Sequence, residues 1–426
     1  AGVGDDWPLA RNVGLAPEDD FLVQGLGWQI PIRFAEIRQA KSLQLVFDAL
    51  EDREKAQEIL GRHAIRSRAG KTLVPFRLTG NLEWGLPAPE LEGLAGLTFW
   101  VWPESLWAPI SFTASVLEGA PRAAATWRDW WCTRSAQVFQ FIGEDNVFFY
   151  SLPQLGMFLG LQGPRPAADA PEGQIQPTRI LANHHLLFLD KKASSSGAVK
   201  PPMARELLDH YTADQLRAHF LGLGLGSKSV SFQPKPLDPK ATERTADPVL
   251  KEGNLLSNAL NRAARSCFYT AQKYFAPAAG GEGRLPPGPI GADVLAACEE
   301  SILAFERAMP APEFHQAMNV AGEHVRQINQ RWTQSKASRD DCDPEVRRQV
   351  LADTFHQVRV AAVLLHPIAP EGTERIREYL RGGPDFWSWG RIFEPIHAVV
   401  PGTLQFLEPR VDFFPKHASQ VAAGDE

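Results

Sequence analysis

Two short segments carry residue types that could hold a nucleotide. Residues 190–197 read DKKASSSG and follow an apolar run, so they offer two ammonium groups, three hydroxyls and backbone N–H groups. These groups stabilise negative charge on phosphate oxygens. Residues 141–146 read FIGEDN, and a strand that ends in Gly143 before a carboxylate such as Asp145 is typical of ribose binding in α/β folds. Each segment also has an ordinary interpretation, a solvated loop for the first and a Gly-Asp turn for the second.

Other candidate sites have weaker spacing. Residues 222–228 read GLGLGSK, but they lack the four-residue gap and the Gly-Lys-Ser/Thr ending of a nucleotide P-loop. They follow a helical pattern and therefore predict a turn that ends a helix. His184 and His185 are adjacent, and neighbouring residues of a strand point to opposite faces, which predicts one buried and one exposed imidazole. No His-Glu-x-x-His occurs, so no catalytic metal site is predicted.

The composition limits the class of protein. With 44 Lys and Arg against 50 Asp and Glu, the net charge of −6 excludes a broadly basic protein that coats nucleic acid. The four cysteines form no Cys-x-x-Cys pair, which excludes a disulfide scaffold and a four-cysteine zinc ribbon and fits a reducing compartment. No apolar run approaches the ~20 residues of a membrane helix. We therefore expect a soluble, cytoplasmic protein without a membrane partner.

The elements that must position these residues change in kind along the chain. Three short apolar runs predict buried strands of a parallel sheet: 97–102, 138–142 and 180–189. Four later segments have the three- and four-residue spacing of helices: 250–275, 293–309, 314–331 and 343–365. Residues 233–248 and 276–291 are rich in proline or glycine and predict linkers or surface loops. The predicted domains are an α/β domain over residues 1–235 and an α-helical domain over 236–426.

Taken in order, segments of the chain resemble the methionyl type of class I aminoacyl-tRNA synthetase. The matching segments are TGNLEWGLPAP at 79–89, FWVWPE at 99–104, FIGEDNVFFY at 141–150, KASSSG at 192–197, ELLDHYTAD at 206–214, LLHPIAPE at 364–371 and EPRV at 408–411. The ordered match covers residues 75 to 412. The resemblance implies an incomplete Rossmann-like catalytic domain with a connective region, followed by an anticodon-binding-like helical bundle. It also implies an ATP-dependent ligase.

The resemblance implies roles for individual residues. Lys191 and Lys192 would hold the phosphates of ATP, which binds with Mg²⁺, together with the loop residues Ser194 and Ser195; Ser195 stands where the family has its second lysine. Gly143 and Asp145 would face the nucleotide. The amino-acid pocket would be lined by Trp102, Ser105, Leu106, Asn146 and Tyr150. Asn146 and Tyr150 replace an apolar residue and a histidine of the family, which favours a small or polar substrate over methionine.

Several departures from the family fall on functional residues. The His-Ile-Gly-His signature is absent from the 426 residues, so we expect the N-terminal half of the catalytic fold to be supplied in cis or in trans. The family's zinc knuckles have no counterpart, so no zinc is expected. Two Asn/Arg pairs four residues apart could face an anticodon, Asn258 with Arg262 or Asn261 with Arg265, although surface helix decoration explains them too. The family's later Pro-Trp pair, whose tryptophan stacks on a base of the tRNA, has no clear counterpart here, since Trp332 lies a few residues too early.

Three functions are compatible with this pattern. The first is activation of an amino acid as its adenylate and transfer to a non-tRNA acceptor, such as a hydroxylated lysine, as in the synthetase-like halves of hydrazine synthetases. The altered pocket and the weakened tRNA contacts favour it. The second is a divergent methionine–tRNA ligase, favoured by the helical bundle. The third is a catalytically degenerate paralogue with a binding or regulatory role, favoured by the absent signature.

Overall fold

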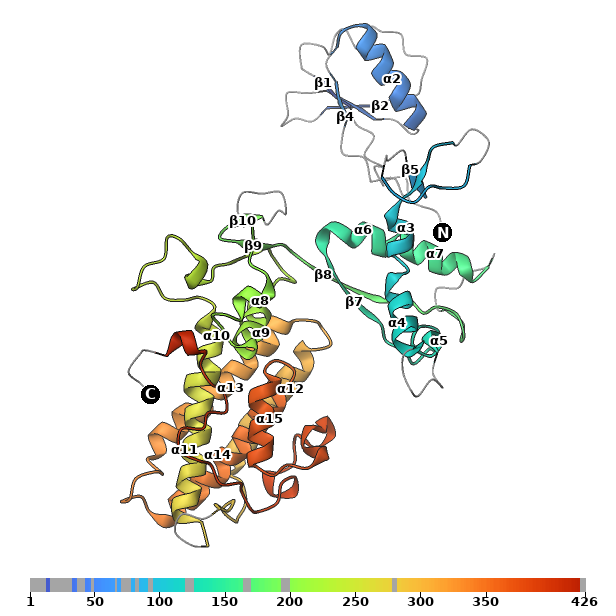
Figure 1. Ribbon diagram of the computed structural model, residues 1–426. Helices are drawn as coiled ribbons and strands as arrows, with labels where there is room; N and C mark the ends of the chain where they lie inside the picture. The colour runs from blue at the N-terminus through green and yellow to red at the C-terminus, as the bar shows by residue number, and fades with distance from the viewer. Residues whose placement is uncertain are drawn as a thin grey trace. The chain divides into compact units, whose positions relative to one another are not determined.

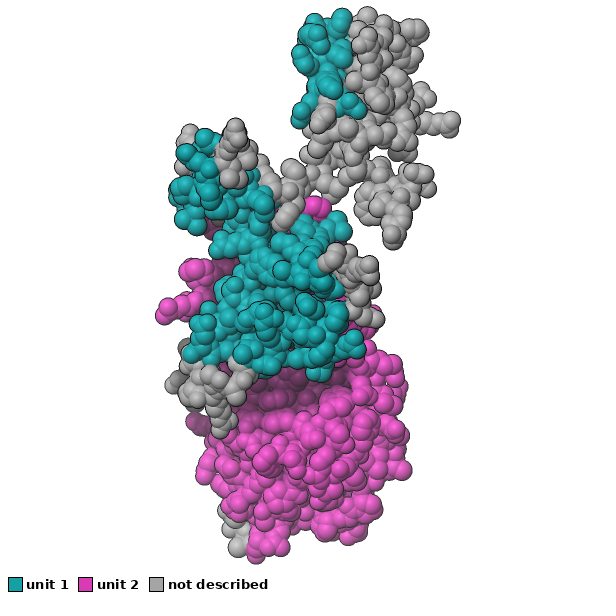
Figure 2. Space-filling model, turned by 90° about the vertical axis from the view of Figure 1, so that its right-hand side faces the viewer, with its two compact units in different colours: residues 1–136, 152–176 teal, residues 137–151, 177–426 magenta. Residues whose placement is uncertain are grey.

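The chain forms two compact units, residues 1–136 with 152–176 and residues 137–151 with 177–426 (Figure 2). The computed structural model describes residues 13–15, 33–36, 43–46, 50–65, 67–69, 78–80, 84–90, 95–118, 126–163, 170–192, 200–277 and 282–421. The predicted domain boundary at residue 235 falls inside the second unit. The α/β segments and the helices of the second unit belong together because α9 (Ala213–Gly222) packs against α13 (Phe314–Ser335) and α15 (Pro370–Tyr379) of the helical bundle.

The first unit opens with a small antiparallel sheet in the order β2-β3-β1-β4 (Figure 1). Its strands are β1 Val13–Leu15, β2 Arg33–Glu36, β3 Leu43–Val46 and β4 Ser67–Ala69, and helix α2 spans Leu50–Arg62. Leu45 of β3 and Ala56 and Leu60 of α2 are fully buried. The remaining elements of this unit are β5 Thr79–Gly80, β6 Thr98–Phe99, α3 Val101–Ser105, α4 Ala108–Glu118, α5 Trp127–Trp131 and α7 Pro153–Leu161.

The strand predicted over 97–102 is wrong. Within this run only Thr98 and Phe99 form a strand, they pair antiparallel with β5, and Phe99 is half-exposed. Helix α3 begins at Val101 with Pro103 in its first turn. Proline lacks the N–H that a strand would need but fits the first turn of a helix, so Pro103 favours the helix.

The second unit contains the strands that carry the candidate nucleotide site. β7 (Phe139–Gly143) pairs in parallel with β8 (Arg179–Asn183), which confirms a strand over 138–142. The strand is not buried as predicted, because Phe139 and Phe141 are exposed. The run predicted over 180–189 forms two strands, β8 and β9 (Leu186–Phe188), because the chain changes partners between them. β9 pairs with β10 (Lys191–Lys192) and with β11 (Val230–Phe232), and not with β7.

Three short helices accompany these strands. α6 Val147–Ser151 follows β7, while α8 Ala204–Leu207 and α9 lie between β10 and β11. Thr212 caps α9 by accepting a hydrogen bond from Gln215 N. α9 ends at Gly222, and Gly224 has a φ of +71°, so the predicted helix-ending turn at 222–228 is confirmed. Tyr211 is buried in a small core with Phe188 of β9 and Phe232 of β11. Its hydroxyl donates to Asp247 Oδ2 at 2.6 Å and so holds the predicted loop 233–248 against this core.

The predicted helices form the bundle in the lower half of Figure 1. They are α10 Leu250–Asn254, a π-helical turn Leu255–Leu260, α11 Asn261–Tyr274, α12 Ala292–Ala308, α13 Phe314–Ser335, α14 Pro344–Leu365 and α15 Pro370–Tyr379. Helix α14 is the central one, since every residue from Leu351 to Leu365 is buried. Leu285 and Ile290 are also buried, so the predicted linker 276–291 packs on the bundle over part of its length. Short 3₁₀ turns complete the unit: Glu144–Asn146, Lys235–Leu237, Pro384–Trp387, Trp389–Arg391, Ile396–Ala398 and Ala418–Gln420.

None of the helices in the described part of the chain has both the length and the apolar character needed to cross a membrane.

Candidate functional site

The carboxyl ends of β7 and β8 meet at one edge of the second unit. The two strands are parallel and in register, with Gly143 opposite Asn183. Glu144, Asp145 and Asn146 form a 3₁₀ turn directly after β7, while two histidines follow β8. Ligands of open α/β sheets bind outside such carboxyl ends. The fold therefore brings the predicted nucleotide residues Gly143 and Asp145 to an edge where a ligand can be bound.

Gly143 leaves this edge open. Its φ of −72° is one that any residue adopts, so the backbone does not require glycine. A Cβ atom placed on Gly143 meets no atom of the described residues within 4 Å. Packing within the protein therefore gives no reason for glycine here, and the space beside the backbone suits the close approach of a ligand.

The two histidines after β8 differ from the prediction of one buried and one exposed ring. Both are half-buried, and both face the acidic turn after β7. His184 Nδ1 lies 2.8 Å from Glu144 Oε2, and His185 Nε2 lies 3.4 Å from Glu144 Oε1 and from Asp145 Oδ1. The prediction is wrong because these residues lie in the break between β8 and β9, where strand alternation does not apply.

The lysine pair follows a tight hairpin turn in a separate sheet, which is formed by β10, β9 and β11. Leu189 and Asp190 connect β9 to β10, with φ values of 47° and 65° that suit a two-residue hairpin turn. Asp190 accepts from Gln233 Nε2 at 3.1 and 3.2 Å, which fixes the turn, and Lys191 is exposed. The side chain of Lys192 and the predicted Ser194 and Ser195 lie outside the described residues.

The predicted amino-acid pocket is divided between the two units. Trp102 and Ser105 are half-buried on α3 of the first unit. Leu106 is fully buried there, and its carbonyl accepts from Gln154 Nε2 at 2.9 Å, so its side chain belongs to the core. Asn146 and Tyr150 belong to the second unit and are half-buried, and neither side chain has a hydrogen-bond partner among the residues described.

The two Asn/Arg pairs of the bundle have different environments. Asn261 is buried: its Nδ2 donates to Asp412 at 2.8 Å and its Oδ1 accepts from Phe413 N at 2.9 Å. Arg265 donates to the same Asp412 carboxylate at 2.7 Å. Asn261 and Arg265 therefore hold the C-terminal segment against α11.

By contrast, Arg262 is exposed, and its guanidinium makes no hydrogen bond or ion pair within the described residues. It lines a cavity of about 490 Å³ together with Asn258 and Lys416, and Asn261 and Arg265 line the same cavity. Asn258 donates only to Asn254 on the preceding helical turn, at 3.1 Å. Both pairs therefore face the cavity, but only the side chains of Asn258 and Arg262 are not bound to Asp412.

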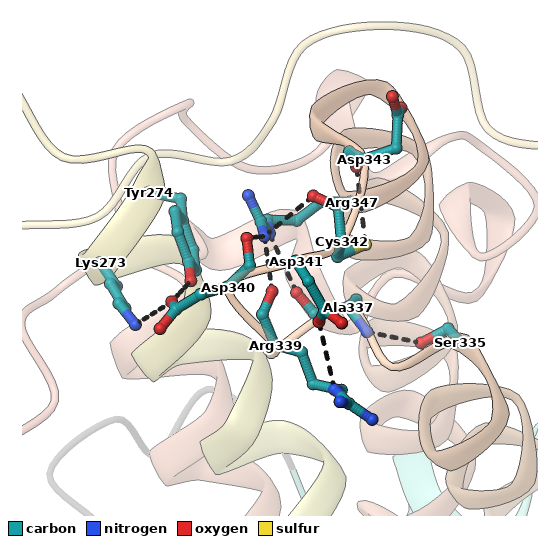
Figure 3. Close-up of polar contacts among 10 residues, drawn as sticks. All are labelled: Lys273, Tyr274, Ser335, Ala337, Arg339, Asp340, Asp341, Cys342, Asp343 and Arg347. Carbon is teal, nitrogen blue, oxygen red and sulfur yellow. Dashed lines mark hydrogen bonds and ion pairs between the residues drawn. The ribbon is translucent and has the colours of Figure 1, made fainter.

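The loop between α13 and α14 is fastened to the end of α11 (Figure 3). Asp340 accepts from Lys273 Nζ at 2.5 Å and from the Tyr274 hydroxyl, and the Lys273 contact lowers the pKa of Asp340. Arg347 is buried and donates to the carbonyls of Ala337 and Arg339 at 3.0 and 2.7 Å. Trp332 packs in the core, so it is not available to stack on a base.

Within the described parts of the chain, no three His, Cys, Asp or Glu side chains gather in a way that could hold a metal ion. The cluster of Glu144, Asp145, His184 and His185 lies among the described residues and does not form such a group. Three of the cysteines, Cys132, Cys267 and Cys298, are buried, and Cys342 is half-buried; none is in a disulfide.

Parallel strands followed by a helical bundle are the arrangement found in class I tRNA synthetases. Residues 48–260, half of the chain, match the family model of tRNA synthetases class I (M). The chain belongs to this methionyl-tRNA synthetase-like family.

Its relatives include methionine–tRNA ligases. That of Thermobifida fusca is 26% identical over 326 residues, which cover 74% of this chain and 50% of the relative. That of Cereibacter sphaeroides is 26% identical over 365 residues, covering 81% and 57%. The chain thus spans about half the length of the curated relatives it matches. The crystal structure of Mycobacterium tuberculosis methionyl-tRNA synthetase bound by methionyl-adenylate superposes with a TM-score of 0.59 at 20% identity, covering 86% of this chain and 64% of that one. The predicted fold class is confirmed.

The contact between the histidines and the acidic turn is one part of the site that was not predicted. The signal in the sequence is partial: two acids follow the strand predicted over 138–142, whereas both histidines lie inside the run predicted over 180–189. The break between β8 and β9 brings them to the carboxyl end of β8, and parallel pairing with β7 places the acids at the same edge.

Proposed function

We propose that this chain activates an amino acid with ATP to form an aminoacyl-adenylate. The observation that carries the proposal is the open edge at Gly143, with Asp145 beside it in the turn after β7. The hairpin that bears Lys191 follows β8 and β9 along the chain. In this reaction the amino-acid carboxylate attacks the α-phosphate of ATP. Catalysis then depends on positioning and on charge stabilisation, which the ammonium groups of Lys191 and Lys192 supply.

We further propose that the substrate is small or polar and that the acyl group goes to a hydroxylated amine such as a hydroxylated lysine. Asn146 and Tyr150 support this, because a methionine thioether facing an unpaired amide or hydroxyl costs ~1–3 kcal/mol per group. A divergent methionine–tRNA ligase is the alternative for the same site. Under this alternative, methionine and tRNA are inferred as substrates from the relatives of the chain and not from the residues of its pocket.

The test is amino-acid-dependent exchange of pyrophosphate into ATP. It is run with the chain alone and with a polypeptide that supplies a strand and helix bearing His-Ile-Gly-His. Exchange with serine or glycine supports the proposal, whereas exchange with methionine and charging of tRNA support the alternative. If no amino acid supports exchange in either arrangement, the chain is not an activating enzyme and the paralogue with a binding role is favoured.

Substitution of Asp145 by asparagine is expected to lower that exchange about 10²-fold, because the amide cannot provide the carboxylate acceptor for the ribose hydroxyls. The matched control is Glu299→Gln, which removes an exposed carboxylate from α12. Equal exchange rates for Asp145→Asn and the wild type would show that Asp145 does not bind the nucleotide.

The cavity lined by Asn258 and Arg262 favours a second role, contact with tRNA. An exposed guanidinium beside an amide and the Lys416 ammonium suits the phosphates and base edges of an unpaired loop. Arg262→Ala is expected to raise the Kd for methionine tRNA about tenfold without changing the unfolding free energy. The control is Arg326→Ala on α13, an exposed arginine that pairs with Glu323 at 2.9 Å. Unchanged tRNA affinity in Arg262→Ala would remove this role.

A further inference from the structure

The acidic turn after β7 and the histidines after β8 form a carboxylate–imidazole pair whose outer nitrogen is available. Glu144 Oε2 lies 2.8 Å from His184 Nδ1. The ring is 38% exposed, and its Nε2 has no partner among the described residues. The backbone of His184 is fixed as well, since its N–H donates to Leu225 O at 2.8 Å. His184 is therefore a positioned imidazole at a ligand-binding edge.

The surroundings of the pair determine which nitrogen can do chemistry. A carboxylate accepts a hydrogen bond, so Glu144 holds the tautomer with the proton on Nδ1 and leaves the Nε2 lone pair as the acceptor. His185 is placed differently, because its Nε2 faces the carboxylates of Glu144 and Asp145 at 3.4 Å each. A base oriented by a third group is the arrangement that activates hydroxyl nucleophiles.

We infer that His184 is the general base of the acyl-transfer step and that Glu144 is its positioning residue. The inference rests on the proposed function, because it needs an aminoacyl-adenylate at the Gly143 edge. The acceptor's hydroxyl proton passes to His184 Nε2 while the hydroxyl oxygen attacks the carbonyl carbon. An ester C–O bond forms, the bond between the carbonyl carbon and the phosphate oxygen breaks, and AMP leaves with that electron pair. A hydroxyl is a poor nucleophile until its proton is removed, so the step needs such a base.

The experiment measures transfer separately from activation. Synthetic seryl-adenylate and N6-hydroxylysine are mixed with the chain, and the formation of ester and AMP is followed over a range of pH. Because the adenylate is preformed, this rate does not depend on pyrophosphate exchange, which is measured in parallel. The wild-type transfer rate is expected to fall on acidification, since a protonated imidazole cannot accept a proton.

His184→Gln is expected to lower the transfer rate about 10²-fold, at least tenfold more than it lowers exchange, and to remove the acid limb of the pH profile. Glu144→Gln, which loses the orienting carboxylate, is expected to lower transfer about tenfold and to keep that limb. His417→Gln is the control, because its imidazole contacts Ser419 in the C-terminal 3₁₀ turn and is not part of the strands β7 and β8.

Four results would overturn the inference. Two concern His184→Gln: a transfer rate equal to that of the wild type, or an equal loss of transfer and exchange. The other two are a loss of the acid limb in His185→Gln instead, and the absence of any acceleration of transfer by the wild type. Failure of exchange with retained transfer from seryl-adenylate contradicts the proposed activation but supports the base.

Discussion

Substitution of Arg359 by methionine is expected to destabilise the helical unit by about 3–5 kcal/mol. Arg359 lies on α14 and is fully buried. Its Nη1 donates to the carbonyls of Ile392 and Glu394 at 3.1 and 2.8 Å, and its Nη2 donates to Arg391 O at 2.6 Å. Burial lowers the pKa of Arg359 to about 10, a sign of how far the guanidinium is removed from water.

Two effects of this substitution oppose each other. Methionine removes a buried charge, and the desolvation of that charge disfavours the folded state. The backbone carbonyls of Ile392 and Glu394, however, lose the guanidinium donor, at ~1–3 kcal/mol each. Arg391 O keeps its hydrogen bond from Glu394 N at 3.1 Å. The loss of hydrogen-bond donors costs more than the removal of the buried charge gains, because the methionine side chain can replace the packing of the arginine but none of its hydrogen bonds. The stability of Arg359→Lys is expected to lie between that of the wild type and that of Arg359→Met, since one ammonium cannot reach all three acceptors as the planar guanidinium does.

Urea unfolding followed by tryptophan fluorescence measures this effect. Trp387 and Trp389 lie in the 3₁₀ turns beside the segment that Arg359 holds, so they report its release. Arg381→Met is the matched control, because Arg381 is exposed and pairs with Glu282, a surface contact worth less than about 1 kcal/mol. Equal unfolding midpoints for Arg359→Met and Arg381→Met would show that the buried guanidinium does not hold the segment.

The helices of this unit follow from local sequence, which is why they could be predicted. Asp343 precedes Pro344, and its carboxylate accepts from Glu345 N and Val346 N, an N-cap that the sequence itself indicates. The strands depend on partners elsewhere in the chain. The run 180–189 contains a break only because β9 pairs with β11, some 40 residues further on, and periodicity within the run does not contain that information.

The same difference decides how much of the site could be predicted. Gly143 and Asp145 were placed correctly at the end of a strand, since a strand followed by glycine and an acid is a local pattern. The choice between Asn258/Arg262 and Asn261/Arg265 could not be made from spacing, because both pairs lie four residues apart on a helix. Asp412, about 150 residues away, binds Asn261 and Arg265 and so leaves the other pair available.

Acidification is expected to destabilise the helical unit through two buried histidines. His324 is fully buried: Nε2 faces Gln357 O and Nδ1 faces Ser301 Oγ, each at 3.2 Å. A carbonyl only accepts, so the neutral ring carries its proton on Nε2. Burial lowers the pKa of His324 from 6.5 to about 4. Burial likewise lowers the pKa of His356 to about 3, and His356 Nδ1 has no partner in the part of the chain that the structure describes.

The sign of the effect follows from these directions. The folded-state pKa of His324 is below its unfolded value, so between about pH 6.5 and pH 4 the unfolded chain binds more protons than the folded one. The stabilisation is fully present above pH 6.5 and is lost as the pH falls, at about 1.4 kcal/mol per pH unit for each histidine. His324 alone therefore makes the unit about 3 kcal/mol less stable at pH 4 than at neutral pH.

His324→Gln separates this contribution from general acid denaturation, because its amide can still donate to Gln357 O but does not titrate. Its unfolding free energy is expected to be lower than that of the wild type at pH 7.5 and to fall less steeply between pH 6.5 and pH 4. His315→Gln, at a half-buried ring of the same helix, is expected to keep the wild-type slope. Urea midpoints at half-unit steps of pH measure both slopes. A His324→Gln slope as steep as that of the wild type would mean that the carboxylates, and not this buried imidazole, determine the acid stability of the bundle.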